Sequence, residues 1–215
     1  PRGRPKAAWK LFLYNALDLE HTPDDTILSI KNKGVSSMSK NVLIITGSPR
    51  KGGNTDILAG AFADGARQAG HSVEVFDAGQ ASILPCRACD ACNKAGKCVF
   101  NDDFQKLVPM LRKADVIVLA SPLYWYDVSA QLKLVIDKFK SFAGDLHIAE
   151  SVLIMCGAVA EKERFDGAVQ VYKRITEGSL KWHDRGVIIA SSCGPKGAAE
   201  SHPAKEEAFK LGCSL

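Results

Sequence analysis

The sequence lacks three features that would assign it to large classes of protein. Its apolar runs, such as Val116 to Ala120, are far shorter than the ~20 residues of a membrane-spanning helix. It has no long basic run, and its net charge of +4, from 28 basic and 24 acidic residues, gives little reason to expect nucleic acid as a partner. No Ser/His/Asp set or pair of carboxylates can be argued from the spacing, so no catalytic side chain is predicted. We therefore expect a soluble protein without a membrane span.

Cysteine, in contrast, is abundant and unevenly placed. The 215 residues include seven cysteines, and four of them lie between Cys86 and Cys98. Such crowding is more typical of a metal or cluster site than of the disulfide framework of a small secreted protein. This usage favours a reducing compartment, and we expect a cytoplasmic protein.

The length suits one domain with an appendage. Residues 1–37 combine basic residues with an apolar patch, and we expect them to form an N-terminal extension. Met38 is also a possible alternative translation start, which would make this extension dispensable. We expect residues 38–215 to form the main domain, with a cysteine-rich insert near 83–101.

Strand-like and helix-like segments alternate from Asn41 onward. We predict strands near 41–46, 72–76, 115–120, 151–156 and 186–190, and helices near 55–69, 102–113, 129–142, 164–179 and 202–212. This alternation, with right-handed crossovers, predicts an α/β fold: a flavodoxin-like three-layer α/β/α sandwich with a five-stranded parallel sheet of order 2-1-3-4-5. Ligands of such folds bind beyond the carboxyl ends of the strands, where the first and third strands meet.

The segment after the first strand has the composition of a phosphate-binding loop. Three glycines in residues 47–53 let backbone amides approach an anion, and Asn54 or Thr55 can cap a helix that begins at Asp56. The free amides and positive dipole end of that helix suit a phosphate. Arg50 can contact this phosphate or that of a second ligand. The loop matches neither GxxxxGK[ST] nor GxGxxG, and it predicts a nucleotide or flavin cofactor.

A second candidate loop follows the third strand. Residues 121–129, SPLYWYDVS, place three aromatic residues at the carboxyl end of that strand, and Ser129 is positioned to cap the next helix. An aromatic-rich edge suits a flat ring, against which Leu123, Tyr124 or Trp125 can pack. Considered alone, these aromatic residues could instead cover the end of the sheet or a subunit interface.

The four crowded cysteines have the spacing C-x2-C-x2-C-x5-C, formed by Cys86, Cys89, Cys92 and Cys98. Three thiolates at three-residue intervals can converge from one loop, and the fourth can fold back through Gly96. Four thiolates are the usual ligands of an iron–sulfur cluster, and this spacing allows closure on one [4Fe–4S] cluster. Structural zinc and four reduced thiols are the alternatives. The other three cysteines are expected to be core or surface thiols.

Together the two loops carry a resemblance to a known family. SPRKGGNT followed by SPLYWYDVSAQLK is similar to the NADPH-dependent FMN reductases, over most of the chain from Met38 onward. The resemblance implies noncovalent FMN, which accepts hydride from NADPH or NADH and passes the electrons onward. It also implies a third contact from residues 156–159. The implied contacts to the phosphate are Ser48, Arg50, Asn54 and Thr55, and those to the ring are Pro122, Leu123, Tyr124 and Trp125.

The cysteine spacing, inserted after the second strand, resembles that of the iron-sulfur flavoprotein subgroup. This resemblance implies that cluster and FMN exchange electrons, and that a homodimer or homotetramer brings the cluster of one subunit toward the flavin of another. The expected partners are NADPH or NADH and a small-molecule or protein acceptor. Two alternatives are a single-electron-transfer protein that works with a ferredoxin-like partner and a non-catalytic flavin-binding redox sensor.

Overall fold

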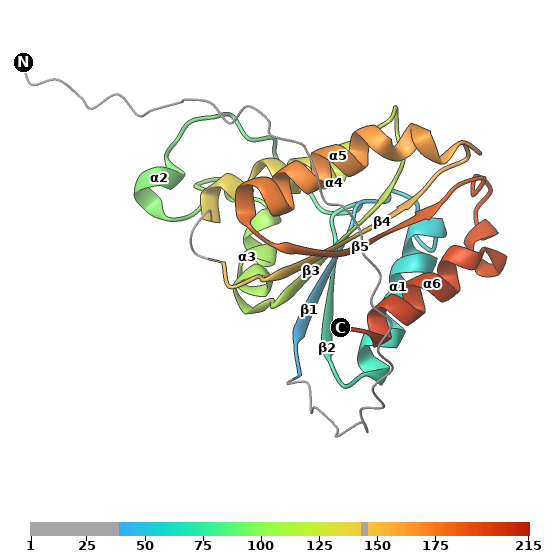
Figure 1. The fold of residues 1–215 in the computed structure, drawn as a ribbon. Helices are drawn as coiled ribbons and strands as arrows, with labels where there is room; N and C mark the ends of the chain where they lie inside the picture. Colours follow the sequence, from blue (N-terminus) through green and yellow to red (C-terminus); the bar gives the residue numbers. More distant parts are fainter. Residues whose placement is uncertain (1–38, 143–145) are drawn as a thin grey trace, which may run out of the picture. The chain divides into compact units, whose positions relative to one another are not determined.

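A computed structural model describes residues 39–142 and 146–215, and the expectations for residues 1–37 lie outside this range. Five parallel strands form one sheet of order β2-β1-β3-β4-β5 (Figure 1). The order and the α/β class are as predicted. The strands are β1 (Asn41–Thr46), β2 (Ser72–Asp77), β3 (Val116–Pro122), β4 (Glu150–Cys156) and β5 (His183–Ala190).

Helices cover both faces of the sheet, with α1 and α6 on one face and α3, α4 and α5 on the other (Figure 1). The α-helices are α1 (Asn54–Gln68), α2 (Cys92–Ala95), α3 (Phe104–Lys113), α4 (Ala130–Asp137), α5 (Asp166–Lys173) and α6 (Pro203–Cys213). Four further turns are η1 (Phe139–Phe142), η2 (Lys162–Phe165), the π-helix η3 (Arg174–Leu180) and η4 (Ala198–Ser201). Within the described ranges, no helix has the length and apolar character needed to cross a membrane.

The central strands are apolar along most of their length because both of their faces are covered. Side chains alternate between the two faces of a strand. In β1, Leu43 and Ile45 pack under α3 and α4, whereas Val42 and Ile44 pack under α1 and α6. Every residue of β3 is buried. The continuous apolar runs in the sequence therefore correspond to strands buried on both sides.

Several predicted element boundaries differ from the structure, and the last strand begins at His183 rather than at residue 186. The first helix begins at Asn54 rather than Asp56, and its N-cap is Gly53, which makes no side-chain cap bond. The predicted helix at 129–142 ends at Asp137 and continues as the 3-10 turn η1. The segment predicted as one helix at 164–179 is divided into three helices of different type. The backbone bonds have 3-10 spacing in η2, α-helical spacing in α5 and π-helical spacing in η3.

Helices α1 and α6 pack closely because glycines lie at their contact. A Cβ atom at Gly65 of α1 would lie 2.0 Å from the carbonyl oxygen of Phe209, and one at Gly212 of α6 would lie 2.2 Å from that of Phe62. The missing side chains allow the two backbones to approach directly. This contact fixes α6, and with it the end of the loop that follows β5.

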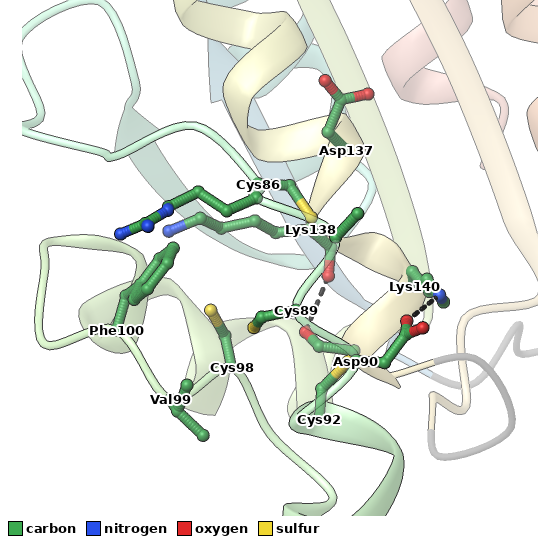
Figure 2. Close-up of a pocket in the computed structure, with 13 residues that line it drawn as sticks. Cys86, Cys89, Asp90, Cys92, Cys98, Val99, Phe100, Asp137, Lys138 and Lys140 are labelled. Carbon is green, nitrogen blue, oxygen red and sulfur yellow. Dashed lines mark hydrogen bonds and ion pairs between the residues drawn. The ribbon is translucent and has the colours of Figure 1, made fainter.

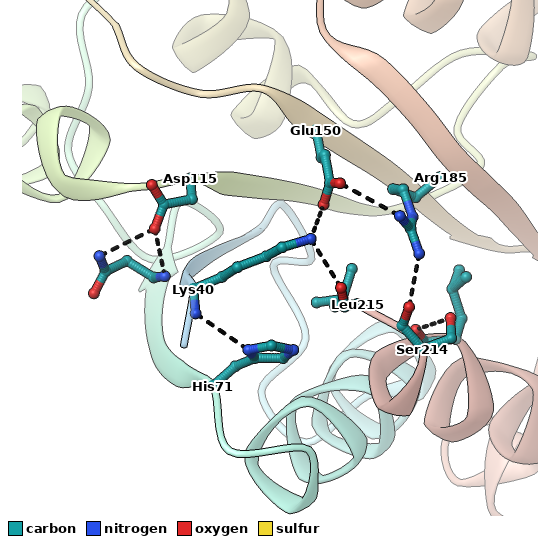
Figure 3. A network of polar contacts seen from close by, with 9 residues as sticks. Lys40, His71, Asp115, Glu150, Arg185, Ser214 and Leu215 are labelled. Atoms are coloured by element: carbon teal, nitrogen blue, oxygen red, sulfur yellow. Dashed lines mark hydrogen bonds and ion pairs between the residues drawn. The ribbon is translucent and has the colours of Figure 1, made fainter. Parts of the chain in front are cut away.

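A polar network joins the amino ends of β4 and β5 to the residues after α6 (Figure 3). Lys40 donates from Nζ to the Glu150 carboxylate at 2.7 Å and to the Leu215 carbonyl oxygen at 2.8 Å. Arg185 donates to the other Glu150 oxygen at 3.3 Å and to the Ser214 carbonyl oxygen at 2.7 Å. The network lies at the end of the sheet opposite the carboxyl ends of the strands.

Candidate functional site

The loops at the carboxyl ends of the strands line one cavity of about 200 Å³. All the predicted contacts to the phosphate and the ring except Trp125 line it, together with residues of the loop after β5. Of the implied third contact at residues 156–159, all but Val159 line it as well. The lining residues are Ser48, Arg50, Gly53, Asn54, Thr55, Pro122, Leu123, Tyr124, Cys156, Gly157, Ala158, Cys193, Gly194 and Lys196. Segments far apart in the sequence thus meet at the predicted end of the sheet.

Trp125 lies outside this cavity because the chain makes a tight turn there. The backbones of Tyr124 and Asp127 exchange N–H···O bonds of 2.9 and 3.1 Å, and Trp125 and Tyr126 between them have φ of +48° and +67°. Two left-handed residues are the geometry of a type I′ turn, which non-glycine side chains adopt at a cost. Trp125 is 94% exposed. The turn presents aromatic side chains at the rim instead of in the cavity.

A second, more open hollow of about 490 Å³ adjoins the cavity. Leu123 and Tyr124 line both, so the two hollows share a wall. The outer hollow is completed by Trp125, Tyr126, Val159 and Arg164. Arg164 donates to the Tyr126 hydroxyl at 2.8 Å. The arrangement is therefore polar and cationic at the β1 loop, and largely aromatic at the outer hollow.

The β1 loop is held in place by the neighbouring loops. Gly47 donates its N–H to the Ala120 carbonyl oxygen at 2.8 Å and accepts from the Ser129 hydroxyl at 2.6 Å. Ser129 also accepts from the Leu132 N–H at 3.3 Å, which confirms it as the cap of α4. A Cβ atom at Gly79 would lie 1.9 Å from the Ser48 carbonyl oxygen, so the backbone of the loop after β2 packs directly against the β1 loop.

The first turn of α1 supplies an anion-compatible surface to the cavity. The first amides of a helix have no partner within it, and α1 begins at Asn54 on the cavity wall. Arg50 and the Thr55 side chain line the same wall. Asp56 accepts from the Gly52 N–H at 2.8 Å, and burial raises the pKa of its carboxyl group. Its negative charge would repel an anionic ligand bound at the start of α1.

The Asn54 side chain is occupied by the loop between β5 and α6. Its Nδ2 donates to the carbonyl oxygens of Cys193 at 2.9 Å and Pro195 at 2.8 Å, and its Oδ1 accepts from the Ala199 N–H at 3.2 Å. Both amide hydrogens are used, so only the backbone of Asn54 is left to donate to a ligand. The loop that it holds contributes Lys196 to the cavity. Sequence reasoning missed this loop, although its position after the last strand was a usable signal.

Two buried cysteines on the cavity wall are uncharged thiols at neutral pH. Burial raises the pKa of Cys156 to about 11, against the opposing effect of the Thr55 hydroxyl 3.3 Å from its Sγ. Burial also raises the pKa of Cys193. Both residues belong to the core on the α1 and α6 side, as predicted for them. Neither is poised as a thiolate nucleophile.

The four crowded cysteines line a separate cavity of about 90 Å³ under η1 (Figure 2). All four are free thiols. Ala88 and Asp90, on either side of Cys89, have φ of +50° and +55°, a backbone alternation that turns amides toward an anion, as at many Fe–S sites. Across residues 39–142 and 146–215, no three His, Cys, Asp or Glu side chains lie close enough together to hold a metal ion. The four thiols are chemically suited to a cluster, but their present spacing is too wide, and ligation by all four would require the segment to contract.

A buried ion pair anchors this cysteine-rich segment. The Lys138 and Asp102 side chains are 1% and 4% exposed, and Lys138 donates from Nζ to the Asp102 carboxylate. Asp102 also accepts from the N–H groups of Leu84 at 2.9 Å and Phe104 at 3.1 Å. The latter bond gives a partner to the first backbone N–H of α3, whose N-cap residue Asp103 makes no side-chain cap bond. Asp102 thus joins the start of the insert, α3 and the end of α4.

Comparisons with known proteins agree with this geometry. Residues 40–171 match the NADPH-dependent FMN reductase family. An iron-sulfur flavoprotein from Methanosarcina thermophila is 30% identical over 171 residues, which cover 76% of this chain and 83% of that protein. Another from Methanocaldococcus jannaschii is 36% identical over 97 residues, 45% of this chain and 50% of that relative. An NAD(P)H:quinone oxidoreductase from Methanothermobacter marburgensis has the same fold, with a TM-score of 0.69 at 19% identity over 82% of this chain and 96% of its own.

Proposed function

The chain belongs to the NADPH-dependent FMN reductase family, and from this premise we propose an FMN-dependent oxidoreductase that takes electrons from NADPH or NADH and passes them to a small-molecule or protein acceptor. The observation that carries the proposal is the meeting of three loops. The β1, β3 and β4 loops line one cavity at the switch point of the sheet, where ligands of this fold class bind. The cavity contains the cationic Arg50 and adjoins an aromatic hollow, with which it shares Leu123 and Tyr124.

The residues of the β1 loop would hold the flavin phosphate. Arg50 supplies a charged donor, Ser48 and Thr55 supply hydroxyls, and the first amides of α1 supply further donors. Asn54 would contribute through its backbone, because its side chain is already hydrogen-bonded.

The ring would extend toward the outer hollow. Pro122, Leu123 and Tyr124 line the passage, and Trp125 lies at its rim. FMN supplies the hydride and electron chemistry when bound, and the chain binds it, orients it and limits access of water. No acid–base side chain is required for this role.

We also propose that Cys86, Cys89, Cys92 and Cys98 hold a [4Fe–4S] cluster, which supplies single-electron transfer when bound. The four thiols line one cavity, where Arg87 would offset part of the negative charge of a thiolate-ligated cluster. The two lysines that line the cavity, Lys138 and Lys140, are already paired with Asp102 and Asp90. The relatives named as iron-sulfur flavoproteins support this assignment. A homodimer or homotetramer that brings cluster and flavin of different subunits together completes the proposal, with residues 1–37 as an extension to a main domain that begins at residue 38.

The test is an absorption spectrum of anaerobically purified protein, followed by FMN titration and iron and sulfide analysis. We expect the absorption bands of a flavin. We also expect four iron and four sulfide per chain, which is the composition of a [4Fe–4S] cluster. Replacing Arg50 by Ala should weaken FMN binding about tenfold, whereas Arg67→Ala, at the exposed far end of α1, should not. Absence of FMN binding would reject the flavin site, and near-zero iron after reconstitution would reject the cluster.

Exposure of the cysteine segment favours a second candidate function. Cys86 and Cys89 are exposed, so a cluster there would be accessible to a protein partner. The protein could then exchange single electrons with a ferredoxin-like protein and reduce no substrate at useful rates. Steady-state oxidation of NADPH or NADH by the purified protein separates the two: rapid turnover supports the reductase, and negligible turnover with fast reduction by a ferredoxin supports the electron carrier.

A further inference from the structure

The loop between β5 and α6 forms a fourth wall of the flavin cavity, and its one charged contribution is Lys196. We propose that Lys196 is a second cationic contact to the phosphate, which makes the site selective for a phosphomonoester flavin, and that Asn54 is the positioning residue that holds Lys196 there. The inference rests on the proposed FMN site and assigns roles that the β1 loop alone does not contain.

The position of Lys196 relative to the β1 loop is the first argument. Its Nζ lies 3.9 Å from the point that a Cβ atom on Gly52 would occupy, so the ammonium group lies next to the backbone of the β1 loop. Arg50 lines the same cavity from that loop. Among the described residues that line the cavity, Arg50 and Lys196 are the charged ones. The two cations therefore reach the same space from different segments of the chain.

The hydrogen bonds of Asn54 are the second argument. Its side chain is buried and makes three bonds, all to backbone atoms of residues 193–199. These bonds bracket Lys196 on both sides, at Pro195 and Ala199. Asn54 is also the first residue of α1 and, with Thr55, lines the cavity. One residue thus fixes the distance between the helix end and the lysine that lies beside it.

The charge of the ligand is the third argument. A phosphomonoester carries about −1.5 to −2 at pH 7. Arg50 supplies one positive charge and a helix end about half of one, while Asp56 in the first turn of α1 opposes both. A second cation is needed to balance the phosphate, and Lys196 supplies it. Riboflavin, which lacks the phosphate, gains nothing from this charge.

The experiment compares FMN and riboflavin on the full-length chain after the flavin has been removed. Fluorescence titration gives both dissociation constants for wild type, Lys196→Gln, Lys196→Arg and the matched control Lys51→Gln. Lys51 is exposed on the same β1 loop but does not line the cavity. We expect Lys196→Gln to weaken FMN about tenfold and leave riboflavin unchanged, whereas Lys196→Arg and Lys51→Gln stay within about threefold of wild type for FMN.

Two results would overturn the proposal for Lys196 while FMN still binds the wild type: an unchanged affinity for FMN in Lys196→Gln, or equal losses for FMN and riboflavin. A wild type that binds neither flavin would overturn the FMN site itself. For Asn54, the Asn54→Ala variant should weaken FMN, and Lys196→Gln should add little to that loss because the lysine is already displaced. Additive losses would show that Asn54 does not act through Lys196. Urea unfolding of each variant verifies that it is folded.

Discussion

Replacing Asp102 by Asn is expected to destabilise the main domain strongly, because it leaves the buried ammonium of Lys138 without its counter-charge. The two side chains are 1% and 4% exposed, and the Lys138 Nζ lies 5.4 Å and 5.1 Å from the ring centroids of Phe100 and Phe104. Removing one partner of a buried ion pair costs about 3–5 kcal/mol. The Asn oxygen can replace only one of the two carboxylate oxygens, so the amide nitrogen would face the N–H of Leu84 or of Phe104. The loss therefore reports the missing charge together with one lost backbone bond.

The companion variants separate charge from packing. Lys138→Met should cost less than Asp102→Asn, because Asp102 keeps the N–H bonds from Leu84 and Phe104. The double variant contains neither charge, and we expect its stability to lie within about 2 kcal/mol of wild type. The double-mutant cycle would then show a coupling of several kcal/mol between the two residues.

The assay is urea unfolding followed by circular dichroism, with thermal unfolding as a second measure. A loss of 3–5 kcal/mol corresponds to a fall in Tm of about 6–20 °C for a domain of this size. The matched control is Asp137→Asn, which breaks an exposed pair with Lys133 and should cost less than about 0.5 kcal/mol. A loss below 1 kcal/mol for Asp102→Asn, or losses that add in the double variant, would refute the reasoning.

Three further predictions test the fold around the proposed flavin cavity. Gly65→Ala should destabilise the protein by several kcal/mol, because the new Cβ would lie 2.0 Å from a backbone oxygen of α6. Gly60→Ala in the same helix has no atom within contact distance of its Cβ and should stabilise the protein by about 0.4–1 kcal/mol. Equal effects of the two variants in urea unfolding would contradict this prediction. Burial raises the pKa of Cys156 from 9.0 to about 11, so above pH 9 the thiol ionises first in the unfolded chain. The free energy of unfolding should therefore fall by about 2–3 kcal/mol as the pH rises to 11. Cys156→Ala should flatten this part of the pH profile of stability, and a profile identical to that of wild type would contradict the prediction. Ser129→Ala should cost about 1–2 kcal/mol and weaken FMN, because it removes the α4 cap and the bond to Gly47; unchanged FMN affinity would show that the β1 loop holds its shape without it.

Much of the fold was predictable because its determinants are local. The apolar runs of β1 and β3 and the helix-compatible segments between strands predict a parallel sheet, and the crossover rule then restricts the strand order. The same rule places the β1 and β3 loops at one edge, so the meeting of Arg50, Thr55 and Leu123 at one cavity follows from topology. The start of α1 was predicted two residues late, because Asn54 bonds to the β5–α6 loop and does not act as the cap.

The sequence by itself determined the sheet, the two candidate cofactor loops and the cysteine spacing, since each depends on residues that are neighbours in the chain. Only the tertiary structure decided that Asn54 binds the loop carrying Lys196, more than a hundred residues away, and that Lys138 is buried against Asp102. It also decided that Trp125 lies at the rim, because the tight turn there directs it outward. Contacts between distant segments depend on packing and desolvation, for which the local pattern of residues contains no signal.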